Sequence, residues 1–140
     1  MRALLFLLLP LVMVGCTKNK LAKFNTRIVG SWQLVEINTF GLGSSHIVFN
    51  GGYFTFNSDN TARYYDRNNN TYNGTWYIDA YVYTDDEGDS ETDFILSVDV
   101  KDGSKMKFDR FEIPRFGNSN RFKAKVRNGL NVVTYVFERR

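Results

Sequence analysis

The segment Arg121–Arg127 reads RFKAKVR and alternates strictly between charged and apolar side chains. Successive side chains of a β-strand point to opposite faces, so Phe122, Ala124 and Val126 are expected on a buried face, with the cations in solvent. The segment Thr92–Val100 alternates in the same way. This period of two predicts half-buried strands in both segments.

Turn-forming residues divide the rest of the chain into short segments of the same kind. Asp102-Gly103 and Asn128-Gly129 are hairpin signals, and Asn60 suits a left-handed turn. A short helical turn is expected over Phe24–Val29. The predicted strands are Ser31–Asn38, Ile47–Asn57 (broken at Gly51-Gly52), Thr61–Asp66, Tyr72–Asp79, Ala80–Thr84, Thr92–Val100, Lys105–Ile113, Arg121–Arg127 and Asn131–Glu138.

Eight or nine antiparallel strands form either a sandwich or a closed meander barrel. The run of neighbouring hairpins favours the barrel, because closure leaves no exposed strand edge. The sequence therefore predicts an all-β fold: an antiparallel up-and-down barrel of about eight strands without a long helix. The last strand is apolar on both faces, which predicts an additional contact on its outer side, either with the N-terminal segment or with a partner.

The N-terminus reads as a targeting segment. Ala3–Val14 is an apolar run of twelve residues after Arg2, and a membrane-spanning helix needs roughly 20. The run ends at Gly15-Cys16, and Met13–Cys16 resembles the lipobox of bacterial lipoproteins. The resemblance implies a signal peptide (1–15), palmitate or a similar acyl chain on Cys16, a lipid-anchored tether (16–27) and a barrel domain (28–140). An ordinary secretory signal is the alternative.

The residues after Cys16 indicate at which membrane, and on which face of it, the protein is expected. Thr17 follows the cysteine, which by the sorting rule of that family favours the outer membrane, and the absence of acidic residues in the tether favours the periplasmic face. Lys18, Lys20 and Lys23 can meet anionic head groups, or the tether can simply be solvated.

Composition excludes several functional classes. The chain has 140 residues with one cysteine and one histidine, which leaves no disulfide, cysteine-based zinc site or ordinary hydrolase triad. His46 lacks a nucleophile motif beside it, so neither an enzyme nor a cofactor is expected. A net charge of +3 is too small to indicate nucleic acid.

A second resemblance concerns the barrel. Gly30-Ser31-Trp32 opens the first predicted strand, and the order of motifs VGSWQLVEI, YFTFNSDNTARYY, NGTWYID and YVFERR is similar to lipocalin-like (calycin-type) lipoproteins of the Bacteroidota. The resemblance implies that Gly30 and Trp32 close the barrel floor and that Arg139 or Arg140 stacks on the indole.

Two functions follow as hypotheses. The first is binding of a small apolar or amphipathic ligand, with Glu36 at the barrel mouth on the same face as Trp32, and with Tyr53, Tyr65 and Trp76 in an aromatic cup. The same aromatic residues could instead form a plain barrel core or a docking patch. The second is docking of an accessory lipoprotein on an outer-membrane protein complex.

Charge is divided unevenly along the chain. Residues 17–100 hold six basic and eleven acidic residues, whereas residues 101–140 hold eleven basic and four acidic ones.

The acidic run 85–93 is either a calcium loop or a solvated hairpin tip. Lys105, Lys107, Lys123 and Lys125 are expected on one outer face that meets an anionic surface or serves only solubility.

Overall fold

The structure, a computed structural model, describes residues 16–140, with side chains described from Leu21 onward except at positions 114, 115 and 117. The predicted signal peptide, residues 1–15, lies outside the described residues, as does the side chain of Cys16. The described elements are α1 (Cys16–Ile28), β1 (Gly30–Phe40), β2 (Tyr53–Phe56), β3 (Thr61–Tyr65), β4 (Thr71–Thr84), β5 (Ser90–Asp102), β6 (Lys105–Asn118), β7 (Arg121–Asn128) and β8 (Asn131–Arg139).

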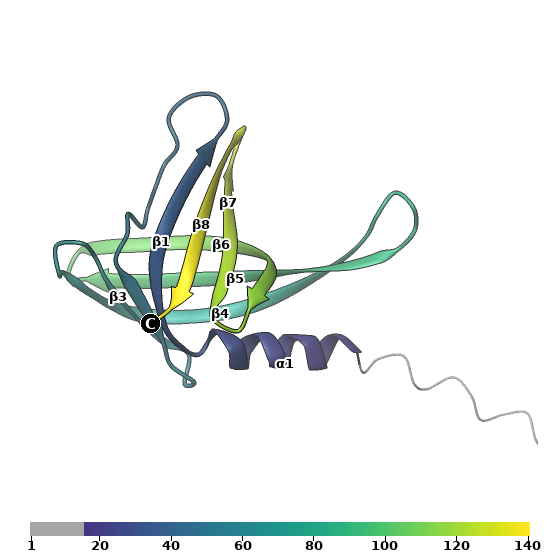
Figure 1. The fold of residues 1–140 in the computed structure, drawn as a ribbon, viewed down its shortest axis with the longest axis horizontal. Coiled ribbons are helices and arrows are strands. Elements are labelled where there is room, and N and C mark those ends of the chain that lie inside the picture. The colour runs from purple at the N-terminus through teal and green to yellow at the C-terminus, as the bar shows by residue number, and fades with distance from the viewer. Residues whose placement is uncertain (1–15) are drawn as a thin grey trace, which may run out of the picture.

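The strands form a closed antiparallel barrel (Figure 1). Each strand pairs with its neighbour in sequence, and β8 pairs with β1 to close the ring. The predicted all-β meander barrel is confirmed. Alternation sets the faces as expected, since Phe122 and Ala124 of β7 are fully buried and the intervening lysines lie outside.

The turn residues adopt the conformations that their types favour. Asn60 has a φ of 65°, and Gly103 and Gly129 have φ values of 56° and 60° in the β5–β6 and β7–β8 turns. These left-handed positions let short turns join neighbouring strands without strain.

Two predicted strands have different bounds. The predicted strand Ile47–Asn57 is regular only over β2, and the preceding residues fold as a loop that places Phe49 in the core at 0% exposure. The segments Tyr72–Asp79 and Ala80–Thr84 are one strand, β4, because pairing with β5 continues without a break from Asn73 to Thr84.

Helix α1 occupies the segment that was expected as a tether with one helical turn. Leu21, Phe24 and Ile28 recur at helical spacing and pack on the core, which explains why this polar stretch is ordered as a helix. The helix lies across one end of the barrel (Figure 1). Phe24 stacks on Phe94 with ring centroids 4.1 Å apart, so α1 is fastened to the barrel rather than extended away from it.

The outer face of β8 is covered by ion pairs. Val136 is 1% exposed although it points away from the core, because it lies between Glu36 of β1 and Lys123 of β7. Arg121 bonds Glu138 at 3.2 Å and approaches Glu36 at 3.8 Å across the strand. Side chains of the neighbouring strands β1 and β7 therefore cover this face, which is a different contact from the two that were expected.

Candidate functional site

Trp32 and Arg139 close the end of the barrel beneath α1. Trp32 is fully buried, its Nε1 donates to the Ile28 carbonyl at 2.7 Å, and the Arg139 guanidinium carbon lies 4.3 Å from the indole centroid. Gly30 has a φ of 129°, and a Cβ there would stand 2.5 Å from Arg139 Nη1. Gly30 is thus required for the close approach of Arg139 to the floor.

The barrel interior is filled by aromatic rings. Phe49 packs against Phe54 and Tyr64 at centroid distances of 5.0 and 4.9 Å, and Phe122 stacks on Phe137 at 4.5 Å. Such offset and edge-on packing excludes water and leaves side chains, not a ligand, along the axis. The places for a ligand in this conformation are therefore the ends of the barrel.

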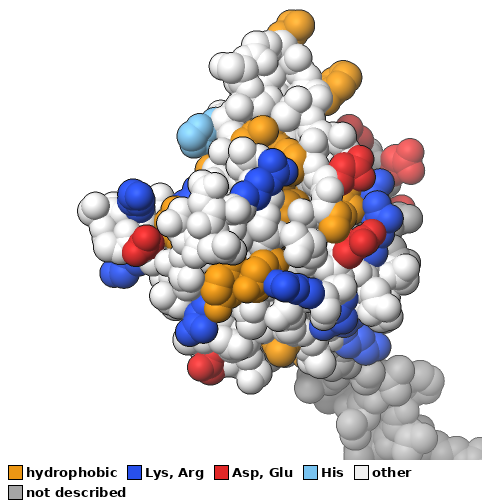
Figure 2. All heavy atoms as spheres, turned by 60° about the vertical axis from the view of Figure 1, so that its left-hand side comes forward, with side chains coloured by type: hydrophobic (Ala, Val, Ile, Leu, Met, Phe, Trp, Pro, Cys, Tyr) orange, Lys and Arg blue, Asp and Glu red, His pale blue; other side chains and the backbone are white. Residues whose placement is uncertain are grey.

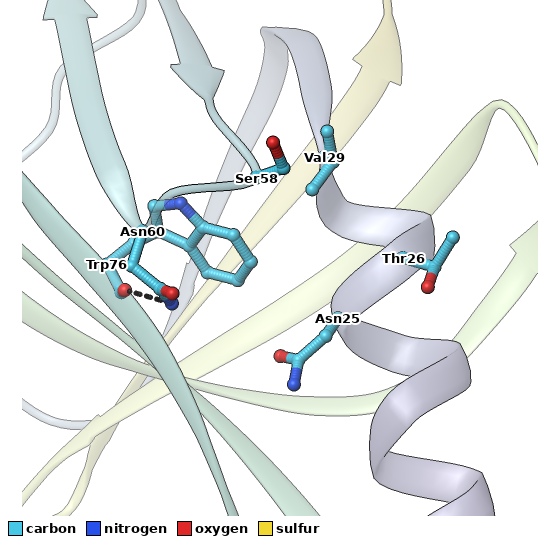
Figure 3. Close-up of a pocket in the computed structure, with 6 residues that line it drawn as sticks. All are labelled: Asn25, Thr26, Val29, Ser58, Asn60 and Trp76. Carbon is cyan, nitrogen blue, oxygen red and sulfur yellow. Dashed lines mark hydrogen bonds between the residues drawn. The ribbon is translucent and has the colours of Figure 1, made fainter.

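A pocket of about 350 Å³ lies between α1 and the barrel (Figure 3). We call it the helix pocket. The side chain of Asn25 extends from α1 toward the indole of Trp76, and Val29 follows at the end of the helix. The helix pocket is lined by Asn25, Thr26, Val29, Ser58, Asn60 and Trp76.

The lining of the helix pocket is neutral, with polar and apolar parts. Asn60 donates through Nδ2 to the Trp76 carbonyl at 3.1 Å, and Trp76 Nε1 donates to the Asn57 carbonyl at 2.9 Å. Among the described residues, Asn25 Oδ1 is buried and has no hydrogen-bond partner. An unpaired buried acceptor is costly, so a donor on a ligand or a water molecule would stabilise this position.

Among the predicted ligand residues, only Trp76 lies in the helix pocket. The predicted inward position of Glu36 is wrong. A β-bulge between Leu34 and Glu36 shifts the alternation by one residue, so Glu36 points outward, half-exposed, and accepts from Asn38 at 2.7 Å.

Tyr53 and Tyr65 also lie on the outer surface, not in a cup. Their rings stack at 4.4 Å across β2 and β3, and the Arg140 guanidinium covers Tyr53 at 4.1 Å. Phe54 and Tyr64, the next residues on each strand, are the ones that point into the core. These two tyrosines form a cross-strand surface stack.

The opposite end of the barrel holds charged groups that the sequence prediction missed. Lys107 and Asp109 point inward from β6, on the same side as the buried Phe111. Lys107 Nζ donates to the Val48 carbonyl at 2.9 Å, so Lys107 is not part of the predicted basic outer face. The alternation of apolar and polar side chains along β6 was ambiguous because both of its faces carry apolar residues. Met106 and Phe108 lie on the outer face.

Asp109 is a buried carboxyl that takes part in none of the salt bridges found among the described residues. It is 8% exposed, and its Oδ2 has no hydrogen-bond partner. Burial raises the pKa of Asp109, against the opposing effects of the Arg110 backbone N–H and of His46. Burial raises the pKa of Tyr135 and the charge of Asp109 raises it further, against the opposing effects of the Phe49 and Val48 backbone.

Among the side chains that the structure describes, no group of three or more His, Cys, Asp or Glu residues is arranged to hold a metal ion. Within residues 16–140, no helix has the length and apolar character needed to cross a membrane. Comparison with protein-family models, curated proteins and solved structures found no significant match to this chain.

Proposed function

We propose that this chain is a non-enzymatic barrel protein of the bacterial cell envelope that binds a small amphipathic ligand in the helix pocket. The closed barrel is compatible with ligand binding. The observation that carries the proposal is the helix pocket itself, with its volume of about 350 Å³, an indole and a valine on its wall, and an unpaired buried acceptor on Asn25. Apolar pockets with a few convergent polar groups are the usual form of small-ligand sites.

The filled interior argues against a ligand on the barrel axis. A ligand on the barrel axis would have to displace rings such as Phe54 and Phe137, which are at most 1% exposed. A ligand in the helix pocket displaces no core side chain. It would place its apolar part against Val29 and Trp76 and a donor group against Asn25 Oδ1.

The proposal can be tested with a substitution that fills the helix pocket. Ser58 is an exposed turn residue on its wall, so Ser58→Trp should leave the fold intact and occupy the space. With 8-anilino-1-naphthalenesulfonate as an amphipathic fluorescent probe, we expect saturable binding to the mature chain and at least about tenfold weaker binding to the variant. Ser104→Trp, in the exposed β5–β6 turn, is the matched control. Equal binding by both variants would contradict the proposal.

We further propose that acyl chains on Cys16 hold the protein at the outer membrane, facing the periplasm. Support comes from the lipobox-like Met13–Cys16 and from the lysines that follow it. Since α1 begins at Cys16 and packs on the barrel, an acylated cysteine would hold the barrel close to the lipid. Cys16→Ser should release the protein from the membrane fraction or leave its signal uncut. Unchanged processing and retention would exclude this anchor.

Docking on an outer-membrane protein complex is the second candidate function. Three bulky side chains at the end opposite α1 are almost fully exposed: Phe40 and Leu42 at 83% and Leu130 at 80%. Apolar side chains project there at the top of the molecule (Figure 2). Replacing all three with serine should abolish co-purification of envelope proteins without affecting probe binding.

A further inference from the structure

The β4–β5 hairpin extends beyond the barrel as a two-stranded arm, residues 80–93 (Figure 1). β3 pairs with β4 only from Thr71 to Thr75, and β6 pairs with β5 only from Phe94 onward. Within residues 16–140, therefore, the arm has no strand on either side. Residues Tyr81–Thr84 are all exposed.

Beyond Trp76, the edge of β4 has no paired strand beside it among the described residues. The Trp76 N–H donates to the Asn60 carbonyl at 2.9 Å, which is the last backbone bond on that side of β4 among the described residues. By alternation, the N–H and carbonyl groups of Ile78, Ala80, Val82 and Thr84 point to the same free side.

The free edge lacks several of the features by which proteins usually block such edges, although it carries one charged residue, Asp79. The segment 77–84, YIDAYVYT, has no proline, lysine or glycine, and its pairing with β5 contains no bulge. Its tyrosines and valine are residues that favour strands. Tyr81 and Tyr83 are held in place, since Arg110 donates to Tyr81 Oη at 3.0 Å and Tyr83 donates to Glu91 at 2.9 Å.

Charge indicates which strand would pair there. The hairpin from Tyr77 to Ile95 contains seven carboxylates and no lysine or arginine. The ion pairs found among the described residues involve none of these carboxylates. A second copy of the arm would therefore be repelled, whereas a basic strand would be attracted.

We propose that the free edge of β4 binds an extended basic segment of another protein by strand addition. Main-chain hydrogen bonds along residues 78–84 provide the pairing, and Tyr77, Tyr81 and Val82 contact alternate side chains of the added strand. The carboxylates of the arm select lysine or arginine at its exposed positions. This surface begins two residues after Trp76 of the helix pocket, and its main-chain pairing uses none of the residues that line the pocket.

The test uses fluorescently labelled peptides and the full mature chain. A nine-residue peptide alternating lysine with valine and threonine should bind, as measured by fluorescence anisotropy, and binding should weaken as salt rises. The same peptide with glutamate in place of lysine should not bind. A version with N-methyl groups on alternate backbone nitrogens keeps the charge but cannot pair as a strand, so it should bind at least about tenfold more weakly.

Matched variants locate the edge. Val82→Pro removes an N–H that faces the free side, and proline is tolerated at such edge positions. It should reduce peptide binding about tenfold or more, whereas Val82→Thr, which keeps this N–H and changes only the side-chain contact, should weaken binding by less than about twofold. Circular dichroism checks that both variants stay folded. Equal binding of the N-methylated peptide, equal binding by Val82→Pro, or self-association of the chain in place of peptide binding would overturn the proposal.

Discussion

Arg139 joins parts of the molecule that are far apart in sequence. Its guanidinium covers Trp32, while Nη2 donates to the Arg27 carbonyl at 2.8 Å and Nε to the Ser119 carbonyl at 3.3 Å. A cation at the C-terminal end of α1 also interacts favourably with the unpaired carbonyls there. The late arginine therefore fixes the helix, the floor and the β6–β7 turn in one place.

Unlike Arg139, the ionised Asp109 lowers the stability of the folded state. Its folded pKa lies above the ordinary value of 3.8, because burial disfavours the ionised form. The native state therefore binds this proton more tightly than the unfolded state does. The resulting stabilisation is present below the ordinary pKa and is lost as the pH rises through the folded pKa.

Asp109→Asn should therefore stabilise the barrel at neutral pH. We expect its Tm at pH 7 to exceed that of the unmodified chain by about 2–6 °C, which is roughly what 1 kcal/mol produces in a domain of this size. The difference should shrink as the pH falls toward 4. Thermal denaturation followed by circular dichroism measures both, with exposed Asp102→Asn as control. A variant that is less stable at pH 7 would show that the carboxylate is satisfied in the native state.

At the scale of elements, periodicity predicted most strands because each has one buried and one solvated face. It failed where backbone pairing departs from that pattern. The bulge after Leu34 reverses the outward and inward positions that follow it, and nothing in the side chains of β1 marks it. The prediction for β6 was wrong for another reason. Both faces of β6 carry apolar residues, so alternation could not decide whether Lys107 and Asp109 point inward or outward.

Helix α1 was largely missed because its apolar stripe has few residues and begins before the barrel. Leu21 and Phe24 are only partly buried, and their role is visible only with the ring of Phe94 beside them. The helix pocket could not be predicted either, since Asn25 and Trp76 meet only when α1 folds back across the barrel end.

Phe24→Ala should therefore loosen α1 without unfolding the strands. The stack on Phe94 at 4.1 Å and the contact with Phe116 at 5.0 Å are lost, while the core rings stay in place. Hydrogen exchange should become faster in residues 21–28 and remain slow in β7 and β8. Lys23→Ala, at an exposed neighbour, should change neither region. Equal acceleration throughout the barrel would show that α1 is part of the folding unit.

The whole molecule has three regions that differ in chemistry. The interior is filled with rings, one end carries the neutral helix pocket, and the acidic arm projects from the side of the barrel (Figure 1). This arrangement places ligand binding at the helix-covered end and leaves the core to provide stability.

The most direct measurement is a titration of the ¹⁵N-labelled mature chain with 8-anilino-1-naphthalenesulfonate, followed by NMR. If the helix pocket is the binding site, the largest shifts will occur at the Asn25 side-chain amide, the Trp76 indole N–H and the backbone amides of Ser58 and Asn60. Signals of Phe49 and Tyr135, at the far end, will remain unchanged. Shifts concentrated at those far-end residues, or spread evenly along the barrel, would contradict the account.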